Sequence, residues 1–266
     1  MQAFRAAPLA VGLVVWAATA PAREAKDLPV TQKGVLRVLA VLAEEEAYFV
    51  SDAPRGGLDW ELLEGFAKLH KVGLELIPVS GWDGLIPALV KGRGDIIAGG
   101  FTDTEARRKQ IHFTAETFPT RSVVVTRKPA RRIATLDELK AERIGTLHGT
   151  FMYDDLVAAG IPAARIDDSI PTGGIRQALK EGRITAGVDG IEAALIASAR
   201  DPELQIGLFL GRPASLAYGV RKEDGQLLAA LNEYVANVRR TTTWSRLAMK
   251  YFGASAPEIL KKARGD

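Results

Sequence analysis

Two oppositely charged residues, Arg107 and Asp189, carry the side chains in this sequence that are best suited to hold a small charged molecule. An arginine guanidinium can donate two parallel hydrogen bonds to a carboxylate and stays positively charged at any relevant pH. A carboxylate such as that of Asp189 can pair with an ammonium group. Each residue also has an ordinary alternative, because Arg107 could be one of several exposed basic residues and Asp189 could cap a helix.

Small and hydroxyl-bearing residues follow two of the expected strands. Gly100 and Thr102 come just after the apolar stretch Asp95–Gly99, and α/β sheets bind ligands at the carboxyl ends of their strands. Gly149 and Thr150 lie between an expected strand and an expected helix, so their amides should sit at a helix N-terminus, which attracts a carboxylate. A plain turn at Gly100 and ordinary capping by Thr150 are the alternatives.

Several kinds of chemistry are excluded or disfavoured by residue type. Cysteine is absent, which excludes disulfides, thiolate metal sites, cysteine nucleophiles and lipid attachment through cysteine. The histidines, His70, His112 and His148, are too far apart in sequence to form a helical metal-binding pair. The sequence has no P-loop, no Gly-x-Ser-x-Gly elbow and no Gly-x-Gly-x-x-Gly fingerprint. We therefore expect no metal, no cofactor and no catalytic residue.

The composition is that of a globular protein. The chain has 266 residues, 47% of them hydrophobic and 25% charged, and this length allows two lobes with a sizeable core. The 35 basic and 32 acidic residues leave a net charge of +3 and interleave along the chain. This balance gives little support to nucleic-acid binding.

Residues 1–22 have the layout of a secretory signal peptide. Arg5 is followed by an apolar stretch over 6–18 and then by small residues up to Ala22. This stretch of about 13 residues is shorter than the roughly 20 that a membrane span needs, although an anchor is the alternative. We expect cleavage after Ala22 and export of the mature chain to a periplasm.

The remaining sequence twice alternates apolar strands with amphipathic helices. Strands are expected at Leu36–Val41, Leu74–Val79 and Asp95–Gly99, with helices at Trp60–Leu69 and Trp82–Lys91 between them. The expected inner faces of these two helices consist of Trp60, Leu63, Phe66, Ala67 and Leu69 in the first and Leu85, Ile86, Leu89 and Val90 in the second. Strands that are separated by helices pair in parallel, which predicts an α/β lobe. A second series and two closing helices follow at Ser122–Thr126, Arg143–Leu147, Phe151–Ala159, Thr172–Glu181, Thr185–Asp189, Gly190–Ala199, Leu204–Leu210, Leu227–Val238 and Trp244–Phe252.

Several segments, in this order, resemble the extracellular solute-binding proteins of family 3, the polar-amino-acid receptors of ABC transporters. The most specific is WDGLIPALVKGRGDIIAGGFTDTEARRKQIHF, residues 82–113, and the resemblance covers nearly all of Leu36–Gly253. It implies an α/β, two-lobed periplasmic-binding-protein fold of type II. Each lobe would be a mostly parallel sheet flanked by helices, with the ligand cleft between them. We expect lobe 1 over 27–121, lobe 2 over 122–215 and a return to lobe 1 over 216–266.

The resemblance also implies a role for each candidate residue. Arg107 matches the arginine that grips the ligand α-carboxylate, and Gly149 and Thr150 match the Gly-Thr pair that closes on this carboxylate from the second lobe. Asp189 matches the acidic residue that receives the α-ammonium. Together they would recognise an α-amino acid zwitterion. The residues that the resemblance implies around the α-carboxylate and α-ammonium of the ligand are Gly100, Thr102, Arg107, Gly149, Thr150 and Asp189.

The aromatic side of the cleft follows the family less closely. The loop AEEEAYFVSDAPRGG, residues 43–57, lacks the usual prolines, and Tyr48 and Phe49 are its candidate ligand contacts. Trp82 is a further candidate, which could instead cap a helix or pack in the core. Asp59 matches an acidic residue with a structural role.

These matches predict a monomeric periplasmic receptor. It would capture an amino acid or similar small zwitterion by hinge closure and deliver it to the membrane permease of an ABC transporter. Three departures from the family, Asp103, Glu116 and Arg121, bear on the ligand class.

Two alternatives stay open. One is an enzyme that resembles cyclohexadienyl dehydratases, which would need a cleft carboxylic acid such as Glu116 or Asp103 as general acid. The other is a sensor module, because GLDWEL is reminiscent of the solute-binding-like domain of membrane-bound lytic transglycosylases. Such a module would bind cell-wall fragments or a protein partner. The sequence ends soon after Gly253, so we expect no lysozyme-like domain.

Overall fold

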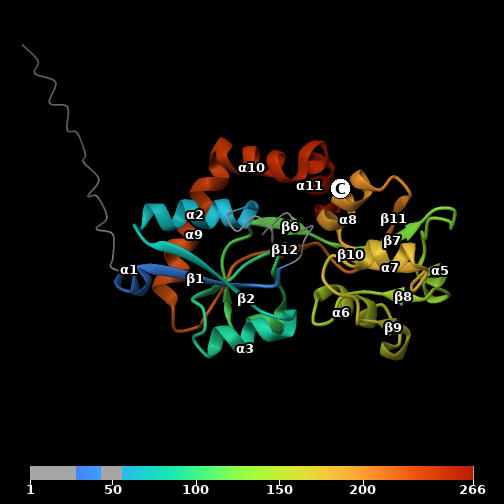
Figure 1. The fold of residues 1–266 in the computed structure, drawn as a ribbon, viewed down its shortest axis with the longest axis horizontal. Coiled ribbons are helices and arrows are strands. Elements are labelled where there is room, and N and C mark those ends of the chain that lie inside the picture. Colours follow the sequence, from blue (N-terminus) through green and yellow to red (C-terminus); the bar gives the residue numbers. More distant parts are fainter. Residues whose placement is uncertain (1–27, 43–55, 266) are drawn as a thin grey trace, which may run out of the picture.

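A computed structural model of the chain describes residues 28–42 and 56–265, and it places them in two α/β lobes that lie side by side (Figure 1). The predicted two-lobed α/β fold is confirmed. The expected signal peptide over 1–22 and the candidate contacts Tyr48 and Phe49 lie outside the described residues.

The first lobe is built on a five-stranded sheet with the order β2-β1-β3-β13-β5. Strand β1 (Val35–Ala40) pairs in parallel with β2 (Gly73–Pro78) and with β3 (Ile96–Ile97). Late in the chain, β13 (Gly219–Val220) returns to this sheet and pairs antiparallel with β3 and with β5 (His112–Phe113). The expected parallel pairing therefore holds for the early strands, and antiparallel strands complete the sheet.

Helices α2 (Leu58–Leu69) and α3 (Leu85–Val90) connect the parallel strands of this lobe. The predicted inner face of α2 is confirmed for Trp60, Leu63 and Phe66, which are all buried. Leu69 and Val90 were expected on inner faces too, but they are 66% and 59% exposed. Each is the last residue of its helix, so the helix does not continue beyond it to cover the side chain.

The second lobe is built on a sheet with the order β11-β7-β10-β8-β9. Strand β10 (Ala186–Gly190) pairs in parallel with β8 (Ile144–Gly145) and antiparallel with β7 (Ser122–Arg127). The outer strands are β9 (Ile166–Asp167), parallel to β8, and β11 (Leu204–Phe209), antiparallel to β7. The carboxyl end of β10 faces the first lobe and ends in the predicted site residue Asp189 and the glycine after it.

Two stretches of chain cross between the lobes and pair with each other. They contain β6 (Phe118–Thr120) and β12 (Ala214–Leu216), which are antiparallel neighbours. Strand β4 (Thr102–Asp103) joins them in a separate three-stranded sheet. The lobes are thus joined through one small sheet, next to the predicted ligand residues.

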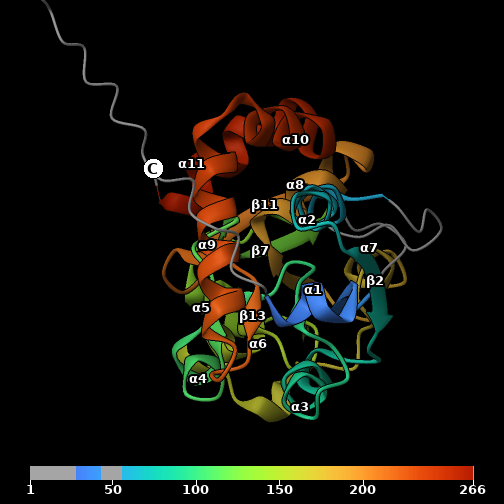
Figure 2. The ribbon, with the colours of Figure 1, turned by 90° about the vertical axis from the view of Figure 1, so that its left-hand side faces the viewer.

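Long helices close the chain. Helix α9 (Gly225–Arg240) leads into α10 (Thr242–Phe252), which lies over α2 (Figures 1 and 2), and α11 (Ala256–Arg264) packs against β6 and α8. The remaining elements are α1 (Pro29–Lys33), η1 (Trp82–Gly84), α4 (Glu105–Arg108), α5 (Leu136–Lys140), α6 (Phe151–Ala158), η2 (Ala163–Arg165), α7 (Ile175–Lys180), α8 (Ile191–Arg200) and η3 (Gly253–Ser255). Among the helices of residues 28–42 and 56–265, none has both the length and the apolar character of a membrane span.

The crossing strand β6 is held in place by an aromatic stack. The Phe118 ring is fully buried, with its centroid 4.6 Å from that of Phe252 and 5.7 Å from that of Trp244. We predict that Phe118→Ala lowers the free energy of unfolding by about 3–5 kcal/mol, because the cavity left behind cannot collapse fully. Urea denaturation measures this change. The exposed Leu69→Ala is the control, and an equally small effect of both substitutions would contradict the account.

Candidate functional site

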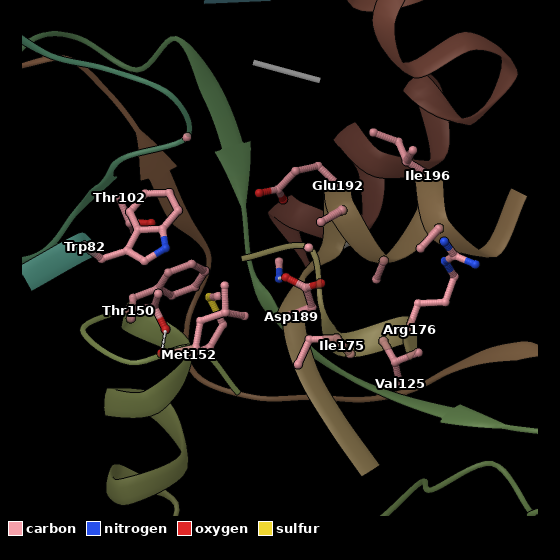
Figure 3. A pocket seen from close by; sticks show the side chains of 18 of the residues that line it. Trp82, Thr102, Val125, Thr150, Met152, Ile175, Arg176, Asp189, Glu192 and Ile196 are labelled. Atoms are coloured by element: carbon pink, nitrogen blue, oxygen red, sulfur yellow. Dashed lines mark hydrogen bonds between the residues drawn. The ribbon is translucent and has the colours of Figure 1, made fainter. Parts of the chain in front are cut away.

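A cavity lies between the lobes and takes its wall from both of them (Figure 3). The first lobe contributes residues of η1, of the turn after β3 and of the segment that leads into α4. The second lobe contributes the start of α6, the end of β10 and the start of α8. The lining residues around this meeting point are Trp82, Gly99, Gly100, Thr102, Arg107, Thr150, Phe151, Met152, Asp189, Gly190 and Glu192.

The Arg107 guanidinium spans the boundary between the lobes. Its Nη1 donates to the Thr102 carbonyl at 2.7 Å, and its Nη2 donates to the Gly149 carbonyl of the second lobe at 3.0 Å. The guanidinium carbon lies 4.1 Å from the centre of the Phe101 ring. The side chain is partly buried, whereas the next residue, Arg108, is exposed. Arg107 is therefore not a surface arginine of the basic run.

Burial lowers the pKa of Arg107 to about 10, so the group remains positive at neutral pH. A guanidinium carries five N–H donors. Two of its nitrogens hold backbone carbonyls here, and the group still faces the cavity. This arrangement suits the binding of a carboxylate.

A buried aspartate shapes the turn at Gly99 and Gly100. Both glycines have positive φ angles, 92° and 75°, which side-chain-bearing residues rarely adopt. The Asp59 Oδ2 accepts hydrogen bonds from the Gly99 and Gly100 amides at 2.8 and 3.4 Å, and its Oδ1 accepts one from the Tyr218 hydroxyl at 3.0 Å. Asp59 is 2% exposed, and burial raises its pKa to about 6. These contacts agree with the structural role expected for it.

Thr150 stands at the N-terminus of α6, at the wall of the cavity. Its hydroxyl donates to the Leu147 carbonyl at 2.6 Å and makes no capping bond to the helix. The alternative of ordinary side-chain capping is therefore wrong. The positive end of α6 faces the cavity with Thr150, Phe151 and Met152 in its wall.

Asp189 lies within β10, and its carboxyl group points into the cavity (Figure 3). Its Oδ1 accepts a hydrogen bond from the Gly190 amide at 2.8 Å, and burial raises its pKa to about 6. The N-cap of α8 is Gly190, without a side-chain capping bond. The helix-cap alternative for Asp189 is therefore wrong.

Glu192 is a site residue that the sequence analysis missed. It is 6% exposed, lines the cavity from the first turn of α8, and its Oε2 accepts a hydrogen bond from the Thr120 hydroxyl at 2.7 Å. Burial, with a smaller contribution from the Asp189 carboxylate, raises the pKa of Glu192 to about 7. The sequence signal for it was weak: Glu192 follows Asp189 by three residues, at the start of the helix that leaves the site.

Direct contacts join the lobes on the far side of the cavity from Glu192 (Figure 3). The Trp82 Nε1 donates to the Thr172 hydroxyl at 3.1 Å, so this tryptophan lines the cavity and bridges the lobes. It also packs against the core cluster that contains Leu85 and Leu89, as the core alternative predicted, whereas the N-cap of η1 is Gly81. Gly149 has a φ of 71°, and a Cβ there would lie 2.9 Å from the Asp83 nitrogen. Gly149 therefore permits the close approach and offers its carbonyl to Arg107, although it does not line the cavity itself.

The other unusual residues lie outside the cavity wall. Glu116 accepts a hydrogen bond from the Ser215 hydroxyl and pairs with Arg239 at 2.9 Å. Asp103 pairs with Arg108. Arg121 donates to a backbone carbonyl next to the crossing strand β12. The structure thus removes Glu116 and Asp103 as candidate cleft acids. Within the described ranges no cluster of His, Asp and Glu could hold a metal ion.

Comparison with known proteins agrees with this geometry. The chain matches the family model of bacterial extracellular solute-binding proteins, family 3, over residues 43–254. The histidine-binding periplasmic protein of Escherichia coli (strain K12) is 30% identical over 182 residues, which are 64% of this chain and 69% of that protein.

Two further similarities extend the picture. Membrane-bound lytic murein transglycosylase F of Desulfosudis oleivorans is 25% identical over 224 residues, or 81% of this chain and 49% of that protein. The chain therefore spans about half the length of such relatives. A solved structure, an ancestral arginine-binding protein bound to arginine, has a TM-score of 0.73 and 27% identity over 83% of this chain and 99% of that chain.

The buried carboxyl of Glu192 predicts a pH-dependent stability. In the folded chain its pKa is about 7, above the ordinary value of 4.5. The stability that the protonated carboxyl contributes is therefore fully present below the ordinary pKa and is lost as the pH rises through 7. Between pH 5 and 8 we predict that Glu192→Gln loses less unfolding free energy than the wild type, by roughly 2–3 kcal/mol. Denaturant titrations at both pH values measure this difference, with the exposed Glu258→Gln as control. Equal losses in wild type and Glu192→Gln would contradict the prediction.

Proposed function

The chain belongs to the bacterial extracellular solute-binding proteins, family 3, of the amino-acid type, and from this premise we propose that it captures an α-amino acid or a similar small zwitterion between its lobes. The observation that carries the proposal is the placement of Arg107 and Asp189. These oppositely charged groups come from different lobes and face one cavity.

Each end of a zwitterion finds a matching group. The ligand carboxylate is bound by the Arg107 guanidinium, with the N-terminus of α6 at Thr150 on the other side. The ligand ammonium is bound by the Asp189 carboxylate, and the Gly100 turn and Thr102 line the same cavity. Hydrogen bonds to charged groups contribute about 1.5–3 kcal/mol each, so losing either end costs most of the affinity for a small ligand.

Closure of the two lobes is favoured by contacts that form only when the lobes meet. Arg107 and Trp82 of the first lobe touch Gly149 and Thr172 of the second. A ligand that binds both lobes adds to these contacts and favours the closed arrangement over an open one. The motion is a hinge at the crossings that contain β6 and β12, and it involves lobe 1 over 27–121 and 216–266 and lobe 2 over 122–215.

The proposed setting is a periplasm. The apolar leader over 1–22 directs export, and the closed monomer delivers its ligand to the membrane permease of an ABC transporter. Relatives that bind histidine or arginine support an amino-acid cargo. Binding and release require no catalytic chemistry.

Glu192 favours one second candidate. A cyclohexadienyl-dehydratase-like enzyme needs a protonated cleft acid beside a carboxylate-binding arginine, and the buried carboxyl of Glu192 shares the cavity with Arg107. The acid would give its proton to the substrate hydroxyl, which leaves as water. The ring carboxylate would leave as CO2, and its bonding electrons would complete the aromatic ring.

A ligand screen tests the proposed function. Mature protein that has been unfolded and refolded to remove bound solute is screened by thermal shift against millimolar amino acids. A ligand present at about 1,000 times its Kd adds roughly 4 kcal/mol, so the midpoint should rise by several degrees. We predict that Arg107→Ala and Asp189→Asn each abolish this shift, whereas Glu258→Gln on the far helix α11 keeps it.

Three outcomes would contradict the proposal. A flat response to every amino acid would do so directly. Release of phenylpyruvate from prephenate by the wild type, lost in Glu192→Gln, would favour the enzyme. A shift with cell-wall peptides alone would favour the sensor module that the transglycosylase relatives suggest.

A further inference from the structure

The cavity continues beyond the groups that are proposed to hold a zwitterion. Residues of the second lobe alone, on β7, α7, α8 and at the start of β11, complete its wall. We name this part the apolar pocket and define it by Val125, Ile175, Ile196, Ala197 and Leu204. Figure 3 shows its labelled members on the side of Asp189 opposite Trp82 and Thr102, so the pocket extends the ligand site into the second lobe.

Helix α8 sets the length of the apolar pocket. Its wall residues Glu192, Ile196 and Arg200 recur every four positions and therefore share one face of the helix. At about 1.5 Å per residue, the first and the last of them are separated by roughly 12 Å along the helix axis. The two charged groups of an α-amino acid are attached to a single carbon. The cavity is therefore much longer than the part that binds them, and the remainder is left for a side chain.

The apolar pocket is lined by hydrocarbon side chains. Val125 on β7, Ile175 on α7 and Leu204 on β11 are buried, and each faces the cavity. On α8, Ala193 and Ala197 present only methyl groups, which leaves space that larger side chains would fill. Methylene groups of a ligand gain free energy by leaving water for such a lining. The pocket therefore suits a hydrocarbon chain.

The Glu192 carboxyl lies at the Asp189 end of this space. Its Oε2 accepts the hydrogen bond from Thr120 on the crossing strand, and its Oε1 lies over Gly190, where an added Cβ would be 2.6 Å away. Gly190 directly follows Asp189, so both carboxyls stand where the zwitterion site meets the apolar pocket. Beyond them, the described wall of the cavity contains no acidic residue.

The basic residues of the described wall are accounted for as well. Arg107 holds the α-carboxylate in the proposed function. Arg176 and Arg200 line the same cavity, but each already has an interaction partner of its own, so neither is assigned to the ligand. A charged side chain would therefore lose its water in the pocket without gaining an opposite charge, which is costly. A neutral, apolar side chain meets no such cost.

We propose that the apolar pocket binds the side chain of the ligand, and that this ligand is an α-amino acid with a long, neutral, apolar side chain. The proposal rests on the proposed function, because Arg107 and Asp189 hold the α-groups. It deepens that function by naming the class of amino acid, which differs from the histidine and arginine of the relatives named above.

Three probes separate these claims in calorimetry with the full mature chain. L-2-aminoheptanoate has a side chain of four methylene groups that ends in a methyl group. L-lysine has the same four methylene groups and ends in an ammonium group, so it matches the first probe in length and differs in charge. L-alanine has the α-groups and a single methyl group.

The affinities should follow the apolar surface that each probe buries. Each buried methylene group favours binding about fourfold, so we expect 2-aminoheptanoate to bind roughly a hundredfold more tightly than alanine. Lysine should bind about tenfold or more weakly than 2-aminoheptanoate, because its ammonium group finds no counter-charge. The heat-capacity change of binding should be more negative for 2-aminoheptanoate than for alanine, since more apolar surface leaves water.

Two variants assign the difference to the apolar pocket. Ala197→Leu fills the passage and should lower the affinity for 2-aminoheptanoate nearly to that for alanine, with alanine binding unchanged within about twofold. Ile196→Ala, at a half-buried position, should lower the affinity for 2-aminoheptanoate about fivefold and spare alanine. It remains informative if Ala197→Leu fails to fold. Ala199→Leu, at an exposed position of α8, is the matched control.

The outcomes distinguish this inference from the function on which it rests. Equal affinities for alanine and 2-aminoheptanoate, or equal effects of Ala197→Leu and Ala199→Leu, would overturn the apolar pocket and leave the proposed function standing. Lysine binding as tightly as 2-aminoheptanoate would overturn the neutral class. Absence of binding by all three probes, while another amino acid gives a thermal shift that depends on Arg107, would overturn this inference alone. Absence of a response to every amino acid would overturn the proposed function and this inference with it.

Discussion

The desolvation of one guanidinium, that of Arg107, is the constraint around which the cleft is organised. A guanidinium at a lobe boundary loses water and needs protein acceptors for its N–H groups in return. The Thr102 carbonyl accepts one hydrogen bond from it within its own lobe, and the Gly149 carbonyl of the second lobe accepts another. The lobe contact is thus part of the solvation of this charge. A ligand carboxylate takes the same role with a full negative charge, which explains why closure and binding belong to one process.

The small sheet of β4, β6 and β12 connects the cleft to the hinge. Thr102 lies on β4, and Thr120 on β6 donates to the Glu192 carboxyl in the cavity wall. The aromatic stack of Phe118 with Phe252 holds β6 against the closing helix α10. The Glu192 carboxyl in the cavity wall is therefore linked by a single hydrogen bond to β6, one of the strands that join the lobes.

The sequence predicted most of the fold, because apolar periodicity follows the strands and helices that make both sheets. The resemblance to family 3 grouped Arg107, Thr150 and Asp189 as one site, and in the structure all three line one cavity. The sequence analysis missed Glu192 because a lone glutamate at the start of a helix is usually solvated. Its burial depends on the crossing strand that supplies Thr120, a contact between positions 72 residues apart. It left Glu116 and Asp103 open as cleft acids, because their pairing with Arg239 and Arg108 is visible only in the folded chain.

The most direct test of the account measures the distance between the lobes. Cysteine is absent from the chain, so Lys91→Cys on the first lobe and Glu181→Cys on the second, both exposed, give a uniquely spin-labelled pair. Pulsed electron resonance then gives the distance distribution with and without a bound amino acid. The account predicts a shift to shorter and narrower distances on binding, and no shift in the same pair carrying Arg107→Ala. An unchanged distribution under a ligand that calorimetry shows to be bound would contradict it.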